Sequence, residues 1–237
     1  MTSKRPALHD LGRRRLLTAA SASALTLGLP RAFAQAASCT VTPDSGEGPF
    51  YFDPMLVRSD VASGRPGVPL AVALQITRWR DCAPLPGARL DLWQADALGL
   101  YSGYERQDGV GGISTAPAVG ATFLRGTQLA DADGWVRFKT VYPSWYGGRT
   151  PHIHFKVFLA ARERLAGQAF FDEEVNAEIF ENEDPYREHF RKRKAFNDND
   201  PFIDANHDGH VDGVFWEIER YDGGSLAAKA VLTVNDA

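Results

Sequence analysis

The feature that most constrains this fold is an apolar alternation with a period of two, in short segments separated by Gly and Pro. In Pro69–Trp79, every second residue from Leu70 to Ile76 is a large aliphatic. This pattern predicts a strand with one buried face. Related segments recur at Ala88–Gln94, Trp135–Val141, His152–Leu159, Gln168–Phe171, Val214–Glu219 and Leu226–Val234. At least seven strands at this spacing indicate an all-β sandwich or barrel, and we expect an antiparallel β-sandwich.

One polar segment interrupts the strand pattern. Glu173–Asn182 and Asp184–Phe196 have helical composition. We therefore expect a short helical excursion near 173–196, outside the sheets. The sequence shows no internal repeat and no linker to a second domain, so residues 37–237 are predicted to form one domain.

The first 36 residues differ from the rest of the chain in charge and composition. They hold six Lys or Arg residues and one acid. Three arginines at 13–15 precede a mildly apolar run, rich in Ala and Ser, that ends at Pro30. Small residues at the end of this segment suit a signal peptidase. The segment resembles a twin-arginine signal, with an ordinary secretory signal as the alternative. We expect removal of 1–36 and export to the periplasm or the extracellular space.

The charge of the remaining chain excludes some partners. Residues 37–237 carry 20 basic and 29 acidic groups, a net charge of −9. Such a chain is a poor partner for phosphate backbones or anionic lipids. No apolar run reaches the roughly 18 residues of a membrane-spanning helix. We expect neither nucleic-acid binding nor membrane insertion after signal removal. The sequence leaves open whether the chain forms a homo-oligomer.

Only two cysteines are present, Cys39 and Cys82. Two are too few for a disulfide scaffold or a four-thiolate zinc site. In an oxidising compartment the simplest outcome is that they pair with each other. This disulfide would tether the start of the mature chain to the first hairpin. A reduced, buried pair is the alternative.

The chemistry of the chain is concentrated around a His-x-His pair. His152 and His154 stand two residues apart on a predicted strand, so they project from the same face. Two imidazoles on a rigid face form half of a metal site. The alternative is two half-exposed histidines on a solvated face. A Pro- and Gly-rich loop with Tyr142, Trp145, Tyr146 and Arg149 lies just upstream and favours the metal interpretation.

The residue types near the histidines select the metal. Thiolates are not available in number, and no His-Glu-x-x-His motif indicates a zinc protease. A tyrosine phenolate is a hard anionic oxygen, and with a pKa near ~10 it needs a strong Lewis acid to deprotonate at neutral pH. Ferric iron meets that need. A set of Tyr and His ligands therefore predicts a ferric Lewis-acid site rather than a ferrous oxygenase triad.

At these residues the sequence resembles the intradiol ring-cleavage dioxygenases, which cleave catechol and protocatechuate, and it is most similar to their secreted single-chain members. The resemblance covers most of residues 40–171. Its motifs are Gly48-Pro49-Phe50-Tyr51, Cys82–Ala88, Leu92–Ala97, Gly99-Leu100-Tyr101-Ser102-Gly103, Thr122–Gly126 and Tyr146–His154.

By position, the resemblance implies an Fe(III) site with four ligands: Tyr101, Tyr146, His152 and His154. Two further tyrosines are rivals, because each lies within a few residues of a nominated one. Tyr104 is expected to form a pocket wall and Tyr142 to be a packing residue. Arg149 and Gln168 match the active-site arginine and glutamine of the family. An alternative for Gln168 is a strand residue that bonds to backbone.

The resemblance implies an oxidoreductase that binds a catechol-type substrate and O₂. It would cleave the aromatic ring between the two hydroxylated carbons and place both oxygen atoms in a cis,cis-muconate-type product. Tyr146 would take up a substrate proton, and Arg149 and Gln168 would stabilise developing charge. Another class stays open: an exported, non-catalytic β-sandwich that serves as a carrier or binding module. The sequence does not identify which catechol is the substrate.

An acidic loop near the C-terminus has no counterpart in this resemblance. Oxygen-bearing side chains at Asp204, Asn206, Asp208 and Asp212 imitate the start of a calcium-binding EF-hand loop. The twelfth position is Phe215 rather than Glu. Ca²⁺ is thus one expectation, and a solvated turn rich in Asp and Gly is the other.

Overall fold

The strand β1 (Pro69–Arg78) shows how the alternation becomes burial. Its large aliphatic side chains, from Leu70 to Ile76, are at most 2% exposed and belong to the main hydrophobic core. The residues between them are more exposed. The computed structural model describes residues 39–53, 55–110, 112–114, 118–203 and 214–236. The predicted signal segment and the predicted calcium loop lie outside these residues.

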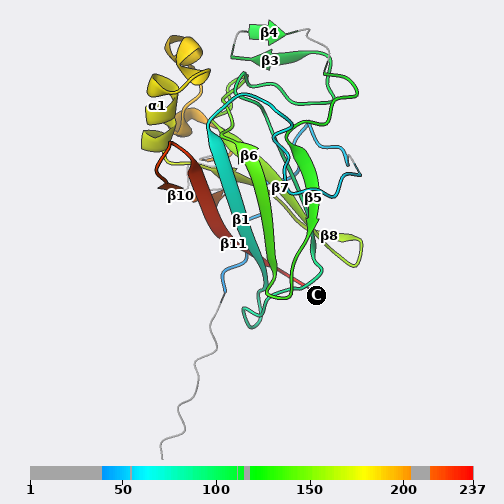
Figure 1. Cartoon of the computed structure of the whole chain (residues 1–237). Coiled ribbons are helices and arrows are strands. Elements are labelled where there is room, and N and C mark those ends of the chain that lie inside the picture. The colour runs from blue at the N-terminus through cyan, green and yellow to red at the C-terminus, as the bar shows by residue number, and fades with distance from the viewer. Residues whose placement is uncertain (1–38, 54, 111, 115–117, 204–213, 237) are drawn as a thin grey trace, which may run out of the picture. The chain divides into compact units, whose positions relative to one another are not determined.

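The described strands form two main sheets and a separate hairpin. The remaining strands are β2 (Arg89–Gln94), β3 (Gln107–Gly109), β4 (Gly112–Ser114), β5 (Arg125–Leu129), β6 (Trp135–Val141), β7 (His152–Leu159), β8 (Arg162–Phe170), β9 (Val214–Phe215), β10 (Glu217–Arg220) and β11 (Leu226–Val234). One sheet has the order β10-β11-β1-β6, the other β5-β2-β7-β8-β9, and β3 pairs with β4. Figure 1 shows the first sheet in front of the second, with α1 and the β3–β4 hairpin at the same end of both. The predicted all-β sandwich is therefore confirmed.

Both sheets are mixed rather than purely antiparallel. β1 pairs in parallel with β11, and β8 pairs in parallel with β9, whereas the other strand pairs are antiparallel. A parallel pair needs a long crossover connection, and the segment between β8 and β9 contains the helices. An alternating pattern reports which face is buried but not the direction of the neighbouring strand, so the sequence did not predict this feature.

The helical excursion follows β8. The helix α1 spans Glu173–Asn182, as predicted, and 3₁₀ helices cover Tyr186–Lys192 (η1) and Asn197–Asn199 (η2). Ile179 and Phe180 of α1 are fully buried and join the core. Among the described residues, no helix is long and apolar enough to cross a membrane.

The strand β7 is buried on both faces. Ile153 and Phe155 face the main core, and His152, His154 and Lys156 on the opposite face are at most 3% exposed. The chain before β1 covers that second face: Glu47 pairs with Lys156, whose ammonium lies 4.0 Å from the centre of the Tyr51 ring. The histidine face is therefore not a solvated surface.

The N-terminal end of the described chain is tied to the first sheet. Cys39 and Cys82 are joined by a disulfide, with Cα atoms 5.7 Å apart. Three residues later, the amide of Thr42 donates to the carbonyl of Thr233 in β11, at 2.9 Å. These links anchor the segment that goes on to cover β7.

Candidate metal centre

The two histidines of β7 present their Nε2 atoms to each other. The Nε2 atoms of His152 and His154 lie 3.1 Å apart, and both side chains are at most 1% exposed. His152 Nδ1 lies 2.7 Å from the carbonyl oxygen of Thr150. A carbonyl can only accept, so Nδ1 carries the hydrogen and Nε2 keeps a free lone pair. This is the tautomer that a metal ligand needs.

Tyr146 is placed by a two-residue hairpin. Its amide donates to the carbonyl of Arg149 at 3.1 Å, and the amide of Arg149 donates back at 2.5 Å. The central residues Gly147 and Gly148 have φ values of 42° and 87°. Positive φ at both positions is typical of a type I′ turn, which glycine adopts without strain. The turn sets Tyr146 beside Arg149, and Tyr146 Oη lies 3.2 Å from His152 Nε2.

Tyr101 reaches the same point from the loop after β2. Its Oη atom lies 3.3 Å from Tyr146 Oη and 3.3 Å from His152 Nε2. Gln107 fixes its backbone, since the Gln107 side chain accepts from the Tyr101 amide and donates to its carbonyl, each at 2.6 Å. The Phe50 ring stacks on the Tyr101 ring with centroids 4.5 Å apart. Tyr101 is thus held at both backbone and ring.

The four nominated side chains therefore converge. The measured separations between their donor atoms run from 3.1 to 3.3 Å. Imidazole nitrogens and anionic oxygens bind first-row metal ions at about 2.0–2.2 Å, which places neighbouring ligand atoms about 3–3.5 Å apart. Among the described residues, no group of three or more His, Cys, Asp or Glu side chains could hold a metal ion. The donors that converge here are two histidines and two tyrosines, and this set fits ferric iron.

Burial controls the protonation of these ligands. It lowers the pKa of His152 and of His154 well below the ordinary histidine value, and the Arg149 charge adds to the effect. Both imidazoles are therefore neutral at neutral pH. Burial also raises the pKa of Tyr101 and of Tyr146, although Arg149 opposes the shift at Tyr146. The phenols need a strong positive charge between them to ionise.

The two rival tyrosines point elsewhere. Tyr142 is buried in the core, and its hydroxyl donates to Asn176 Oδ1 at 2.8 Å. The Tyr104 hydroxyl donates to the Tyr51 carbonyl at 3.2 Å, and its ring stands edge-on to Phe50 at 5.0 Å. Tyr142 therefore packs and Tyr104 lines the aromatic wall.

Arg149 and Gln168 lie together next to the four ligands. Arg149 Nη2 donates to Gln168 Oε1, and Arg149 Nε donates to Asp200 Oδ2 at 2.9 Å. The guanidinium also lies 4.2 Å from the Phe202 ring centre. Sequence reasoning missed Asp200, which also accepts from the Thr150 amide at 2.8 Å. The only signal was an acidic side chain in the turn Asn197–Asp200, which resembles any solvated loop.

A row of cross-strand neighbours surrounds His154. Arg125, Trp93, His154 and Gln168 face one another across β5, β2, β7 and β8, and each is at most 1% exposed. The Trp93 and His154 rings stack at 4.9 Å, nearly parallel. Each member of the row has one buried nitrogen without a hydrogen-bond partner among the described residues: Arg125 Nη1, Trp93 Nε1, His154 Nδ1 and Gln168 Nε2. Unpaired buried donors are costly, so these nitrogens have hydrogen-bonding capacity that the described chain does not use.

Comparisons with known proteins identify the family of the chain. A family model described as "Dioxygenase" matches residues 47–186. An intradiol ring-cleavage dioxygenase from Tetranychus urticae is 31% identical, with a TM-score of 0.72 over 83% of this chain and 95% of that one. A comparison with curated proteins gave no match.

Two bacterial structures extend the likeness. The dioxygenase domain of a dioxygenase–carbohydrate-binding protein fusion from Streptomyces sp. SirexAA-E is 28% identical, with a TM-score of 0.54 over 84% of this chain and all of that one. Hydroxyquinol 1,2-dioxygenase from Pseudomonas putida DLL-E4 shares the fold at 20% identity, with a TM-score of 0.55 over 84% of this chain and 68% of that one. With the family model spanning more than half of the sequence, the chain belongs to the intradiol ring-cleavage dioxygenases.

Proposed function

We propose that this protein is an Fe(III)-dependent dioxygenase that cleaves a catechol-type ring between its two hydroxylated carbons with O₂. The product would be of the cis,cis-muconate type. The observation that carries the proposal is the convergence around His152 Nε2 of two phenol oxygens and the Nε2 atom of His154, each 3.1–3.3 Å from it. Tyr101, Tyr146, His152 and His154 would hold the iron. When bound, the iron would draw electron density from a coordinated catecholate so that the ring itself reacts with O₂.

Tyr146 is the ligand placed to exchange a proton with the substrate. It is 8% exposed, whereas the other three ligands are at most 1% exposed. It also stands at the end of a hairpin rather than inside a sheet. A catechol hydroxyl must lose its proton on binding, and the Tyr146 oxygen is the accessible base for that proton.

Arg149 and Gln168 would stabilise the charge that develops on the substrate. Asp200 holds the guanidinium from one side and Gln168 from the other. With its oxygen engaged by Arg149, Gln168 keeps a free amide donor, Nε2. Donors that are fixed before the reaction stabilise an oxyanion without the cost of reorganisation. Because both oxygen atoms end in the product, the reaction needs no external reductant.

The proposal includes export. The basic, Ala- and Ser-rich segment before residue 37 supports a twin-arginine signal. The Cys39–Cys82 disulfide is typical of an oxidising compartment. An enzyme that needs no reductant suits a periplasmic or extracellular setting, where NADH is not supplied.

The test compares two buried tyrosines that lie four residues apart. Purified protein should contain iron, show a visible tyrosinate-to-iron absorption band, and consume O₂ with a panel of substituted catechols. Tyr146→Phe should weaken the band and lower turnover by about 100-fold or more, as loss of a positioned base and ligand predicts. Tyr142→Phe is the matched control, and it should keep both the band and the turnover. A colourless protein that holds zinc or no metal would instead support the carrier interpretation.

A further inference from the structure

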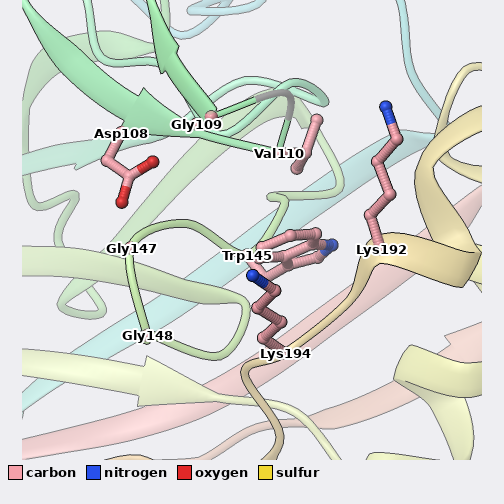
Figure 2. A pocket seen from close by; sticks show the side chains of 9 residues that line it. Asp108, Gly109, Val110, Trp145, Gly147, Gly148, Lys192 and Lys194 are labelled. Atoms are coloured by element: carbon pink, nitrogen blue, oxygen red, sulfur yellow. The ribbon is translucent and has the colours of Figure 1, made fainter.

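A cavity lies beside the Tyr146–Arg149 hairpin. It has a volume of about 400 Å³ and contains none of the four nominated metal ligands. Its walls come from the β3–β4 hairpin, from Trp145 with the Gly147–Gly148 turn, and from the end of η1. Figure 2 shows the Trp145 ring between the side chains of Lys192 and Lys194. This cavity is large enough for a small aromatic molecule.

The two lysines that line this cavity flank a buried arginine. The Arg193 side chain is 1% exposed, and it pairs with Glu173 at 2.6 Å. Arg193 also has extended backbone angles. Neighbouring side chains of an extended segment point to opposite sides, so the buried Arg193 directs Lys194 the other way, while Lys192 is the last residue of η1. Both line the cavity, and neither forms an ion pair within the described part of the chain.

The remaining walls favour a flat, apolar body. Trp145 is 5% exposed and its Nε1 atom is buried, so the indole contributes an apolar wall rather than a donor. Val110 and four glycines complete the wall: Gly109, Gly112, Gly147 and Gly148. Glycine backbone and an indole leave room for an aromatic ring. The two ammonium groups are cationic donors, so the ring should carry an acceptor anion.

Asp108 limits the charge of that anion. Its carboxylate also lines the cavity, so two cations and one anion leave a net charge of +1. This balance suits a monoanion better than a phosphate or a dicarboxylate. A ring hydroxyl could donate to Asp108, whereas a second anionic group would be repelled by it.

We propose that this cavity is a second binding site, separate from the metal centre, for an aromatic monocarboxylate. Lys192 and Lys194, on either side of the Trp145 indole, supply the positive charge that binds the carboxylate. The ring lies against Val110 and the glycine backbone. The ligand contacts the turn that connects Tyr146 to Arg149 but does not displace either residue.

Isothermal titration with benzoate tests this site. Benzoate should bind the purified protein, more weakly as NaCl increases, and benzyl alcohol, which has no charge, should not bind. Lys192→Gln and Lys194→Gln should each weaken benzoate binding by about three- to tenfold, as expected for a charge-assisted hydrogen bond at a partly exposed site. Arg191→Gln is the matched control: it removes one positive charge from the same 3₁₀ helix but does not line the cavity.

Three results would overturn the site. One is benzoate binding that is unchanged in the Lys192→Gln/Lys194→Gln double variant. Another is an equal loss of affinity in Arg191→Gln. The third is a shift of the visible absorption band on adding benzoate that saturates together with the titration heat, because that would place benzoate at the metal centre. Since the heat of binding does not depend on turnover, a protein without dioxygenase activity could still bind benzoate, and the two proposals fail separately.

Discussion

Two buried polar regions lie next to each other in this protein, and they differ in how completely their hydrogen bonds are made. Around the metal centre, the row formed by Arg125, Trp93, His154 and Gln168 leaves one nitrogen unpaired on each member, as far as the described chain shows. The second region lies beneath α1. There Asn176 accepts from Tyr142 and donates to the Phe171 carbonyl at 3.2 Å.

The region beneath α1 is closed by further internal contacts. Arg193 makes two hydrogen bonds to the Glu173 carboxylate, at 2.6 and 2.9 Å, and one to the carbonyl of Ala195. The Thr150 hydroxyl donates to Asn197 at 2.8 Å. The comparison separates two uses of buried polarity. A network that satisfies itself stabilises the fold, whereas buried donors without partners leave hydrogen-bonding capacity for a ligand or water.

The largest difference between the two regions is expected in metal content. His152→Ala removes one of the four converging atoms. The affinity for iron should fall by at least about 100-fold, which is more than the loss of a supporting residue causes. The fold should persist, because the surrounding core is unchanged. Metal analysis measures the iron content, and circular dichroism measures whether the fold persists. The matching change beneath α1, Asn176→Ala, should keep the iron. Full iron occupancy in His152→Ala would remove that residue from the ligand set.

A change in the self-satisfied region should have the opposite profile. In Glu173→Gln, the buried Arg193 loses its counter-charge, while the half-exposed position of Glu173 moderates the cost. The free energy of unfolding should fall by about 2 kcal/mol. Iron content and the visible band should be unchanged. Urea titration measures the free energy of unfolding, and absorption measures the visible band. A colour change with normal stability would contradict the division between the regions.

The sequence was informative where a single segment carries the signal. Alternation identified the buried face of β1 and the core face of β7, and the composition of Glu173–Asn182 predicted the bounds of α1. The histidine pair could be placed because two residues on one strand have a fixed geometry. The tyrosines could be nominated only through the family resemblance, since nothing local brings Tyr101 to Tyr146.

Features that depend on distant segments could not be predicted. The parallel pairing of β1 with β11 joins the two ends of the domain. The cover over the histidine face comes from residues about one hundred positions earlier in the chain, as in the pair of Glu47 with Lys156. Asp200 reaches Arg149 only after the chain has passed through the helices. In each case the physical cause is a tertiary contact, which no local pattern reports.

The smallest expected effect tests whether the cover over β7 positions a ligand or only buries it. Gly48 has a φ of 69°, and a Cβ atom at this position would stand 3.2 Å from His154 Cε1. Gly46 has a similar φ of 74°, but a Cβ there would meet nothing within 4 Å. Gly48→Ala and Gly46→Ala should each lose about 1 kcal/mol of stability from backbone strain.

Only Gly48→Ala should disturb the centre. The added methyl group requires His154 to move by a few tenths of an ångström, which should shift the visible band and lower turnover by about three- to tenfold. Thermal unfolding, absorption and O₂ uptake of the two variants separate strain from displacement. Equal turnover in both would mean that His154 tolerates the movement, so that the segment before β1 serves burial alone. A shift of the visible band in Gly48→Ala alone would show that the segment before β1 positions His154 in the metal centre.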